Sequence, residues 1–193
     1  MTKALLALSR HIDALSALVG HHVRWLILAA ILVSAANAIL RKVFDIGSNG
    51  WLELQWLLFG ASFMLAGADT FRKNAHVRID VLSSRFSKRT RDVIELLGHF
   101  FLLAPFSVVL LVLSWPYFVD SWQQGEVSSN AGGLPVWPAK FLIFAGMLLL
   151  VLQMVSEVIK RSAVLAGIMD EAAPQPVNGR SPSGAGPSGG HVE

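Results

Sequence analysis

The chain has 193 residues, of which 53% are hydrophobic, and its mean hydropathy is +0.54. This composition lies above that of soluble globular domains and indicates a single-domain membrane protein. Cysteine is absent, which excludes disulfides, thiolate metal sites and cysteine nucleophiles. The net charge of +3 is better explained by the loops of a membrane protein than by nucleic acid, for which the sequence offers no support.

Residues 1–22 precede the first long apolar run and carry a helical pattern of their own. Apolar residues recur here at spacings of three and four, at Leu5, Leu8, Ile12, Leu15 and Val19. The pattern predicts an N-terminal amphipathic helix that lies on the cytoplasmic face of the membrane. The alternative is an ordinary helix packed on the loops.

Four segments are long and apolar enough to cross the roughly 30 Å of hydrocarbon as helices. They are residues 23–40, 51–71, 93–119 and 137–159. We therefore predict an all-α membrane protein whose four transmembrane helices form one domain, residues 23–160. Pro105 removes a backbone hydrogen bond from the third span and is expected to kink it.

Lysine and arginine are divided unequally between the two ends of the predicted spans. Thirteen of the 16 lie before or at the start of the first span, between the second and third, or after the fourth. Because positive residues collect in cytoplasmic loops, both termini are expected in the cytoplasm. The cytoplasmic tail, residues 161–193, is rich in Pro, Gly and Ser and is expected to be disordered from about residue 171.

The centres of the predicted spans are apolar. The polar side chains near the estimated midplane are Ser34, Ser62 and Ser107, and a serine in a helix can bond a carbonyl one turn away. Substrate paths inside a bilayer usually contain ionisable residues or broken helices at matching places in two repeats. The sequence therefore predicts no transport path within this chain. It also lacks a nucleophile, base and orienting group at one depth, so an enzyme is not expected.

Charged residues within the spans lie near the span ends. Glu53 falls in the first turn of the second span, where the helix dipole favours a carboxylate, and the alternative is a contact with another subunit. Asp69 can reach Arg72 and Lys73 at i+3 and i+4, which predicts a local ion pair of small energy.

The connection RKNAHVRIDVL, residues 72–82, is unusually polar for this chain. His76, Arg78 and Asp80 occupy alternate positions, so an extended segment would direct them to one side. A metal site would need further converging ligands, which the sequence does not indicate. We expect these residues, with Arg72, to act as a structural clamp.

The connection EVSSNAGGLPVWPAK, residues 126–140, is the other informative loop. Gly132 and Gly133 permit positive φ, Pro135 stiffens the turn, and Pro138 suits the first turn of the fourth span. A defined loop carrying Glu126 and Ser128 could meet a periplasmic partner. A simple re-entry turn is the alternative.

These stretches together resemble the small membrane subunit of tripartite ATP-independent periplasmic (TRAP) transporters, the DctQ-like family, over roughly residues 10–160. The most specific pieces are Glu53 within WLELQW, the string HVRID at 76–80, Glu126 with Ser128, and GGLP at 132–135. The resemblance implies a bacterial inner-membrane subunit without its own substrate site. It would brace a large elevator-type subunit that imports organic acids with sodium, delivered by a periplasmic solute-binding protein.

The same resemblance implies roles for particular residues. Six of them are expected to hold the fold or the contact with the large subunit: Glu53, Trp56, Arg72, His76, Arg78 and Asp80. Five are expected in a docking loop for the binding protein: Glu126, Ser128, Gly132, Gly133 and Pro135. No cofactor or metal is expected.

Two rival functions remain open from the sequence. One is a four-helix haem b anchor, which would need two histidines at similar depth on facing helices. The histidines towards the cytoplasmic side are His21, His22, His76 and His99. The other is a self-sufficient small-molecule transporter.

Overall fold

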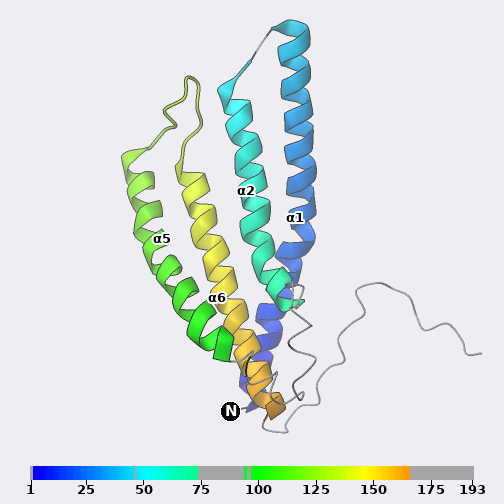
Figure 1. The fold of residues 1–193 in the computed structure, drawn as a ribbon, viewed down its shortest axis with the longest axis vertical. Coiled ribbons are helices and arrows are strands. Elements are labelled where there is room, and N and C mark those ends of the chain that lie inside the picture. The colour runs from blue at the N-terminus through cyan, green and yellow to red at the C-terminus, as the bar shows by residue number, and fades with distance from the viewer. Residues whose placement is uncertain (1, 46, 74–93, 95–96, 166–193) are drawn as a thin grey trace, which may run out of the picture.

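The computed structural model describes residues 2–45, 47–73, 94 and 97–165. Within these residues the elements are α1 (Thr2–Phe44), α2 (Asn49–Arg72), a π-helix (His99–Leu103), α5 (Ala104–Gln124) and α6 (Trp137–Leu165). The predicted all-α fold is confirmed. Figure 1 shows the α1–α2 and α5–α6 connections at one end of the bundle and the N-terminus at the other, near the end of α6.

The segment before the first span is helical, as predicted, but it is not a separate helix. Residues 2–44 form one continuous helix of 43 residues, which at 1.5 Å per residue extends about 65 Å, twice the thickness of the hydrocarbon core. The boundary expected at residue 22 is absent. Gly20 directly follows the apolar pattern and could end a helix, but the run 15–33 contains no proline, and Gly20 stays helical where α1 packs against Asp69 of α2.

The face of this N-terminal part that packs is not its leucine stripe. Ser9 and Ser16 are fully buried, whereas Leu8 and Leu15 are exposed. Ser9 contacts Ser156 of α6, and Ile12 of the predicted stripe is buried as well, so this segment packs on α6 through a mixed face. Because these leucines are exposed, the segment can still contact the membrane surface through them.

Pro105 coincides with a change in helix geometry. The π-helix ends at Leu103, and Pro105 is in the first turn of α5. Proline cannot donate the α-helical bond to the carbonyl four residues earlier, and a π turn is one way for a helix to absorb that loss. Farther along, α5 continues through Pro116 to Gln124, beyond the predicted end at residue 119.

The buried side chains are mostly small or polar and many large apolar side chains are exposed, the reverse of a water-soluble bundle. Apart from Ile12, the buried positions of α1 follow a seven-residue interval, Ser9, Ser16, Val23, Ala30 and Asn37. Those of α5 do the same, Ser107, Ser114 and Ser121. Large apolar side chains such as Leu32, Phe63 and Leu102 are exposed. Small residues let helices approach closely in lipid, where burying leucine gives no advantage over exposing it.

Three of the helices are long and apolar enough to cross a membrane: residues Ala4–Phe44, Phe100–Gln124 and Trp137–Val164. They contain the first and fourth predicted spans and overlap the third over residues 100–119. The helix α2 has 24 residues and covers the second predicted span. It carries Glu53, Gln55 and Asp69, and its composition does not qualify it as a span.

The helix α6 occupies the middle of the bundle, packing on α2, α5 and the N-terminal part of α1. It approaches α2 closely at Gly146, where an added Cβ would lie 2.9 Å from the carbonyl oxygen of Met64. A similar close approach joins α1 to α2, because a Cβ on Gly20 would lie 2.5 Å from the Asp69 side chain. Glycine is required at both positions by the space available.

Candidate functional site

Glu53 binds the loop between α5 and α6. One carboxylate oxygen accepts hydrogen bonds from the Ser128 hydroxyl and from Asn130 Nδ2, the latter at 2.7 Å. The other oxygen accepts the backbone N–H of Leu134 at 2.7 Å. We call these four residues the Glu53 clamp. It fixes the loop near the start of α2. Because α2 begins at Asn49, Glu53 lies just beyond the first turn in which it was expected, and its partner is the loop rather than the end of the helix.

The loop backbone is shaped for this contact. Gly125 and Gly132 have φ values of +59° and +71°, which glycine adopts readily. Gly133 does not have a positive φ, contrary to expectation. It is needed because a Cβ there would lie 2.6 Å from Ser128 Cβ. An isolated antiparallel bridge between Val127 and Pro135 closes the loop.

Glu126 belongs to a different contact from Ser128, although the sequence suggested that the two act together. Its carboxylate accepts a hydrogen bond from Lys140, whose ammonium also lies 4.0 Å from the centre of the Tyr117 ring. Only 8% of Lys140 is exposed, so this cation depends on both partners. The hydrogen bond from Lys140 holds the pKa of Glu126 below its usual value. Pro138 stands in the first turn of α6, as predicted.

Aromatic side chains join α5 to α6 beneath this loop. The ring centres of Trp122 and Trp137 are 4.5 Å apart in an edge-to-face arrangement. Phe118 and Phe141 follow at 5.3 Å, and Trp115 and Phe144 at 5.0 Å. Tryptophan is favoured at membrane interfaces, so this cluster suits the level at which the loop leaves the bundle.

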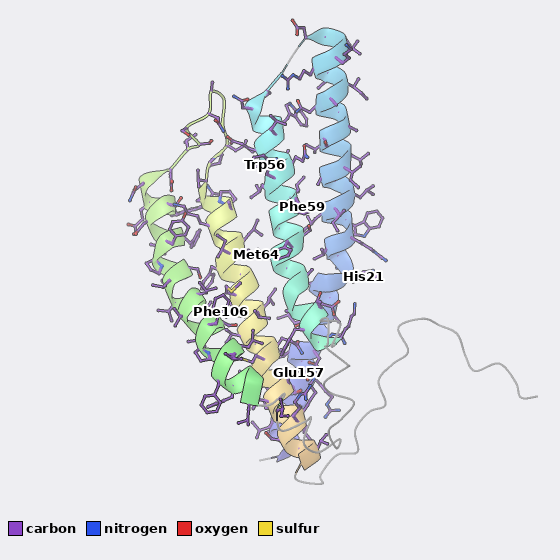
Figure 2. The ribbon with its side chains drawn as sticks, in the orientation of Figure 1. His21, Trp56, Phe59, Met64, Phe106 and Glu157 are labelled. Carbon is purple, nitrogen blue, oxygen red and sulfur yellow. The ribbon has the colours of Figure 1, made fainter. Side chains whose placement is uncertain are left out.

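Of the remaining predicted site residues, Trp56 and Arg72 are described by the structure, and neither is part of the Glu53 clamp. Trp56 is 75% exposed on α2, one turn from Phe59 (Figure 2). Arg72, at the other end of α2, donates to Asp69 at 2.8 Å, and Lys73 pairs with the same carboxylate, which confirms the predicted local pairs. The predicted string His76, Arg78 and Asp80 lies outside the described residues, as does the tail from residue 171.

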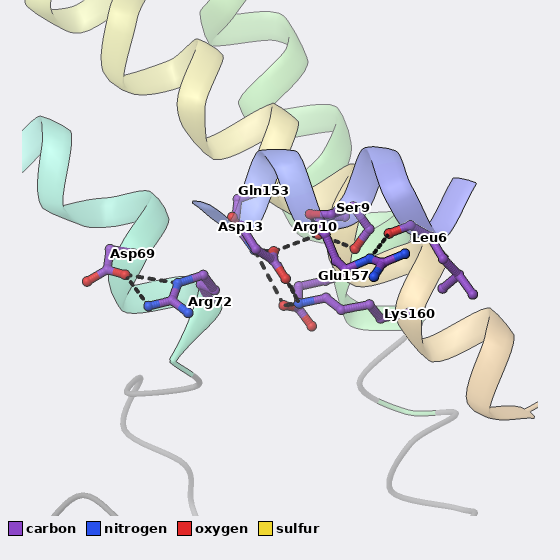
Figure 3. A network of polar contacts seen from close by, with 10 residues as sticks. Leu6, Ser9, Arg10, Asp13, Asp69, Arg72, Gln153, Glu157 and Lys160 are labelled. Atoms are coloured by element: carbon purple, nitrogen blue, oxygen red, sulfur yellow. Dashed lines mark hydrogen bonds and ion pairs between the residues drawn. The ribbon is translucent and has the colours of Figure 1, made fainter. Parts of the chain in front are cut away.

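A second polar cluster, not anticipated from the sequence, joins α1 to α6 (Figure 3). Asp13 accepts hydrogen bonds from Gln153 at 2.8 Å, Ser156 at 2.7 Å and Lys160 at 3.1 Å. The Ser9 hydroxyl lies 2.8 Å from that of Ser156. The sequence interpretation of this helix rested on its apolar residues and assigned no contact to these polar residues. Ser9 and Ser16 are seven residues apart, and this interval was the signal of a packing face.

The polar side chains near the midplane differ in whether they have a hydrogen-bond partner. Ser62 donates to the Phe59 carbonyl at 2.7 Å, as predicted. Ser107 is fully buried, and its hydroxyl has no hydrogen-bond partner among the described residues, contrary to expectation. Asn37 was not anticipated as a buried polar residue. Only 7% of it is exposed, and its Oδ1 also lacks a partner in the described part of the chain.

Two of the three histidines of α1, His21 and His22, are engaged locally. His21 lies 2.6 Å from an Arg24 nitrogen, and His22 Nδ1 lies 2.8 Å from the Leu18 carbonyl, all on one helix. Across the described residues, no group of three His, Asp or Glu side chains is placed to hold a metal ion.

Long apolar helices that bury serines and expose leucines define a multi-pass α-helical membrane protein. A family model described as "Tripartite ATP-independent periplasmic transporters, DctQ component" matches residues 30–163. The chain belongs to this family of small permease subunits, which confirms the resemblance seen in its sequence. No curated protein and no solved structure matches the chain.

Membership in the family makes this chain a transport component rather than an enzyme. It also implies association with a large membrane subunit and a binding protein.

Proposed function

We propose that this chain is the small membrane subunit of a sodium-driven, binding-protein-dependent importer of organic acids, and that it braces the large elevator-type subunit without carrying substrate. The observation that supports the proposal best is the absence of ionisable residues from the helix centres. Residues 25–40, 54–68, 100–119 and 141–156 contain no Asp, Glu, Lys, Arg or His. A carboxylate substrate and a sodium ion would find no charged partner there.

We further propose that α2 crosses the membrane as the fourth span and that both termini face the cytoplasm of a bacterial inner membrane. The helix α2 lies alongside α1 and α6 for most of its length, which supports the first part (Figure 1). Asp69 neutralises part of the charge of Arg72 and Lys73 at one end, and Glu53 is bound by the loop at the other. The unequal distribution of Lys and Arg supports the orientation.

Within this function, the Glu53 clamp presents the loop of Glu126, Ser128, Gly132, Gly133 and Pro135 to the periplasmic solute-binding protein. The clamp and the Glu126–Lys140 pair give the loop a single shape before any partner arrives, which reduces the entropy lost on docking. Trp56, Arg72, His76, Arg78 and Asp80 are proposed to hold the fold or the contact with the large subunit.

Reconstitution tests this function. Vesicles containing this chain alone should show no uptake of an organic acid under a sodium gradient. Vesicles that also contain the large subunit, supplied with binding protein, should show uptake. Purified protein should have no Soret absorption. Accumulation of organic acid by the chain alone would contradict the proposal and support the self-sufficient transporter, and a Soret band would support the haem anchor.

The proposed contact residues have their own test. Arg78→Ala or Asp80→Ala should reduce co-purification of the large subunit severalfold, whereas Arg10→Ala, at an exposed position on α1, should leave it unchanged. Unchanged yield and unchanged uptake in all three variants would remove these residues from the interface.

A further inference from the structure

A groove runs between α1 and α2 on the outside of the bundle. It consists of two hollows of about 850 and 510 Å³ that share Ser34, Ala38 and Gln55 in their walls. We call it the α1–α2 groove. Its position on the surface leaves it open to whatever surrounds the helices in the membrane.

One half of the groove is apolar. Its walls include Ile27, Ile31 and Ala35 from α1, and Trp56 and Phe59 from α2. Trp56 and Phe59 are 75% and 65% exposed, so these rings stand at the edge of the groove rather than in the bundle (Figure 2). A hydrocarbon chain would bury apolar surface against all of these side chains.

The other half of the groove is polar. It is lined by Asn37, Arg41, Lys42, Asp45 and Gln55, among others. Asn37 is more than nine-tenths buried, and its amide oxygen has no partner among the described residues. Leaving a buried amide without its hydrogen bonds is costly in an apolar environment. Arg41 and Lys42 are exposed and form no ion pair with any residue the structure describes, so positive charge predominates at this end.

We propose that the α1–α2 groove binds one anionic phospholipid. An acyl chain lies along the apolar half, and the phosphate oxygens accept hydrogen bonds from Arg41 and Lys42. The Nδ2 of Asn37 and the Nε2 of Gln55 donate to the ester oxygens just below the phosphate, and a hydroxyl of the phosphatidylglycerol headgroup donates to Asn37 Oδ1, which phosphate and ester oxygens cannot do.

The length and the positive charge of the groove both match an anionic phospholipid. From Ile27 to Arg41 the helix rises about 21 Å, close to the depth of one leaflet, whose hydrocarbon is about 15 Å thick beneath the headgroups. A phosphate occurs at the level of Arg41 and Lys42 in every bilayer. A partner helix would instead have to supply an acidic group there. The proposal depends on membrane insertion and not on the role assigned to the subunit.

Lipid binding to the purified full chain in detergent provides the test, with bound lipids counted by native mass spectrometry. The chain should retain one phosphatidylglycerol and bind phosphatidylethanolamine more weakly, because the groove end is cationic. Arg41→Gln with Lys42→Gln should weaken phosphatidylglycerol binding about tenfold or more. Arg10→Gln with Arg24→Gln removes the same charge from the far part of α1 and should leave binding unchanged.

A steric variant separates the groove from general charge effects. Gly60 lines the groove, and a Cβ there meets nothing within 4 Å, so Gly60→Leu places a larger side chain in the groove. It should also weaken phosphatidylglycerol binding, with thermal stability in detergent confirming that the variant folds. Equal binding by the two charge variants, equal binding of the two lipids, or full binding by Gly60→Leu would each overturn the proposal.

The competing occupant is a helix of the large subunit. The chain has no cysteine, so Ala38→Cys places a single thiol in the groove. Lipid occupancy predicts that maleimide labelling in lipid-depleted detergent falls when phosphatidylglycerol is added and is unchanged by the large subunit. Protection by the large subunit alone would show that a protein fills the groove and would overturn the lipid site.

Discussion

At the scale of single residues, the carboxylate of Glu53 decides the shape of the outer loop. It accepts hydrogen bonds from two side chains and one backbone N–H of that loop. Without it, the Leu134 N–H would lose its partner. Gly133 and Ser128 are packed so closely that a side chain larger than glycine would displace the hydroxyl from Glu53. The shape of the loop between α5 and α6 therefore depends on a residue of α2.

Glu53→Ala should loosen the loop without unfolding the bundle. Hydrogen exchange at the Leu134 amide should become about fivefold faster or more, because that amide loses its acceptor. The Glu126 pair with Lys140 is independent of Glu53 and should hold the base of the loop.

Asp120→Asn is the matched control for this variant. It removes an exposed carboxylate of α5 that is not part of the Glu53 clamp. Exchange measured by mass spectrometry on the peptide covering 126–136 should not change in this control. Equal exchange in Glu53→Ala and the wild type would show that the Glu53 clamp does not restrain the loop.

At the scale of helices, packing depends on small residues placed one heptad apart and on close approaches at glycine. The serines of α1 and α5 and the contact of Gly146 with Met64 bring backbones together. Polar contacts add to this, as where Asp13 on α1 meets Lys160 on α6. Interhelical hydrogen bonds in membrane proteins contribute about 0.6 kcal/mol on average. Close packing is therefore the larger requirement.

Gly146→Val should destabilise the bundle by about 1–3 kcal/mol, because its Cβ would overlap the α2 backbone and force α2 away from α6. The measurement is thermal unfolding in detergent, followed by size-exclusion chromatography. Gly67→Ala provides the control, since a Cβ at Gly67 meets nothing within 4 Å. Similar melting temperatures for Gly146→Val and Gly67→Ala would contradict the close α2–α6 contact.

At the scale of the whole molecule, the bundle has two chemically different ends joined by an apolar middle. One end holds the Glu53 clamp and the Glu126–Lys140 pair. The other end holds the polar cluster around Asp13 and the ion pairs of Asp69 with Arg72 and Lys73 (Figures 1 and 3). The middle contains exposed Leu, Ile and Phe side chains. Such an arrangement suits a protein that is fixed in depth in the bilayer and offers its ends to partners.

Labelling of single cysteines checks this arrangement in whole cells. Ser129→Cys, in the outer loop, should react with a membrane-impermeant maleimide from outside. Ser162→Cys, near the end of α6, should react only after the cells are opened. Both positions are exposed, so reactivity reports the side of the membrane. Labelling of the two positions from the same side would exclude the proposed topology.

The sequence alone determined the all-α fold, the family, the approximate helix positions and the local pairs of Asp69 with Arg72 and Lys73. Hydropathy, charge and i+4 spacing are properties of neighbouring residues, so they can be read before the helices meet. Only the tertiary structure decided that Glu53 binds Ser128, 75 residues away, and that Asp13 meets Lys160, 147 residues away. It also decided that serines rather than leucines pack inside, because in a lipid solvent packing is governed by how closely the helices approach.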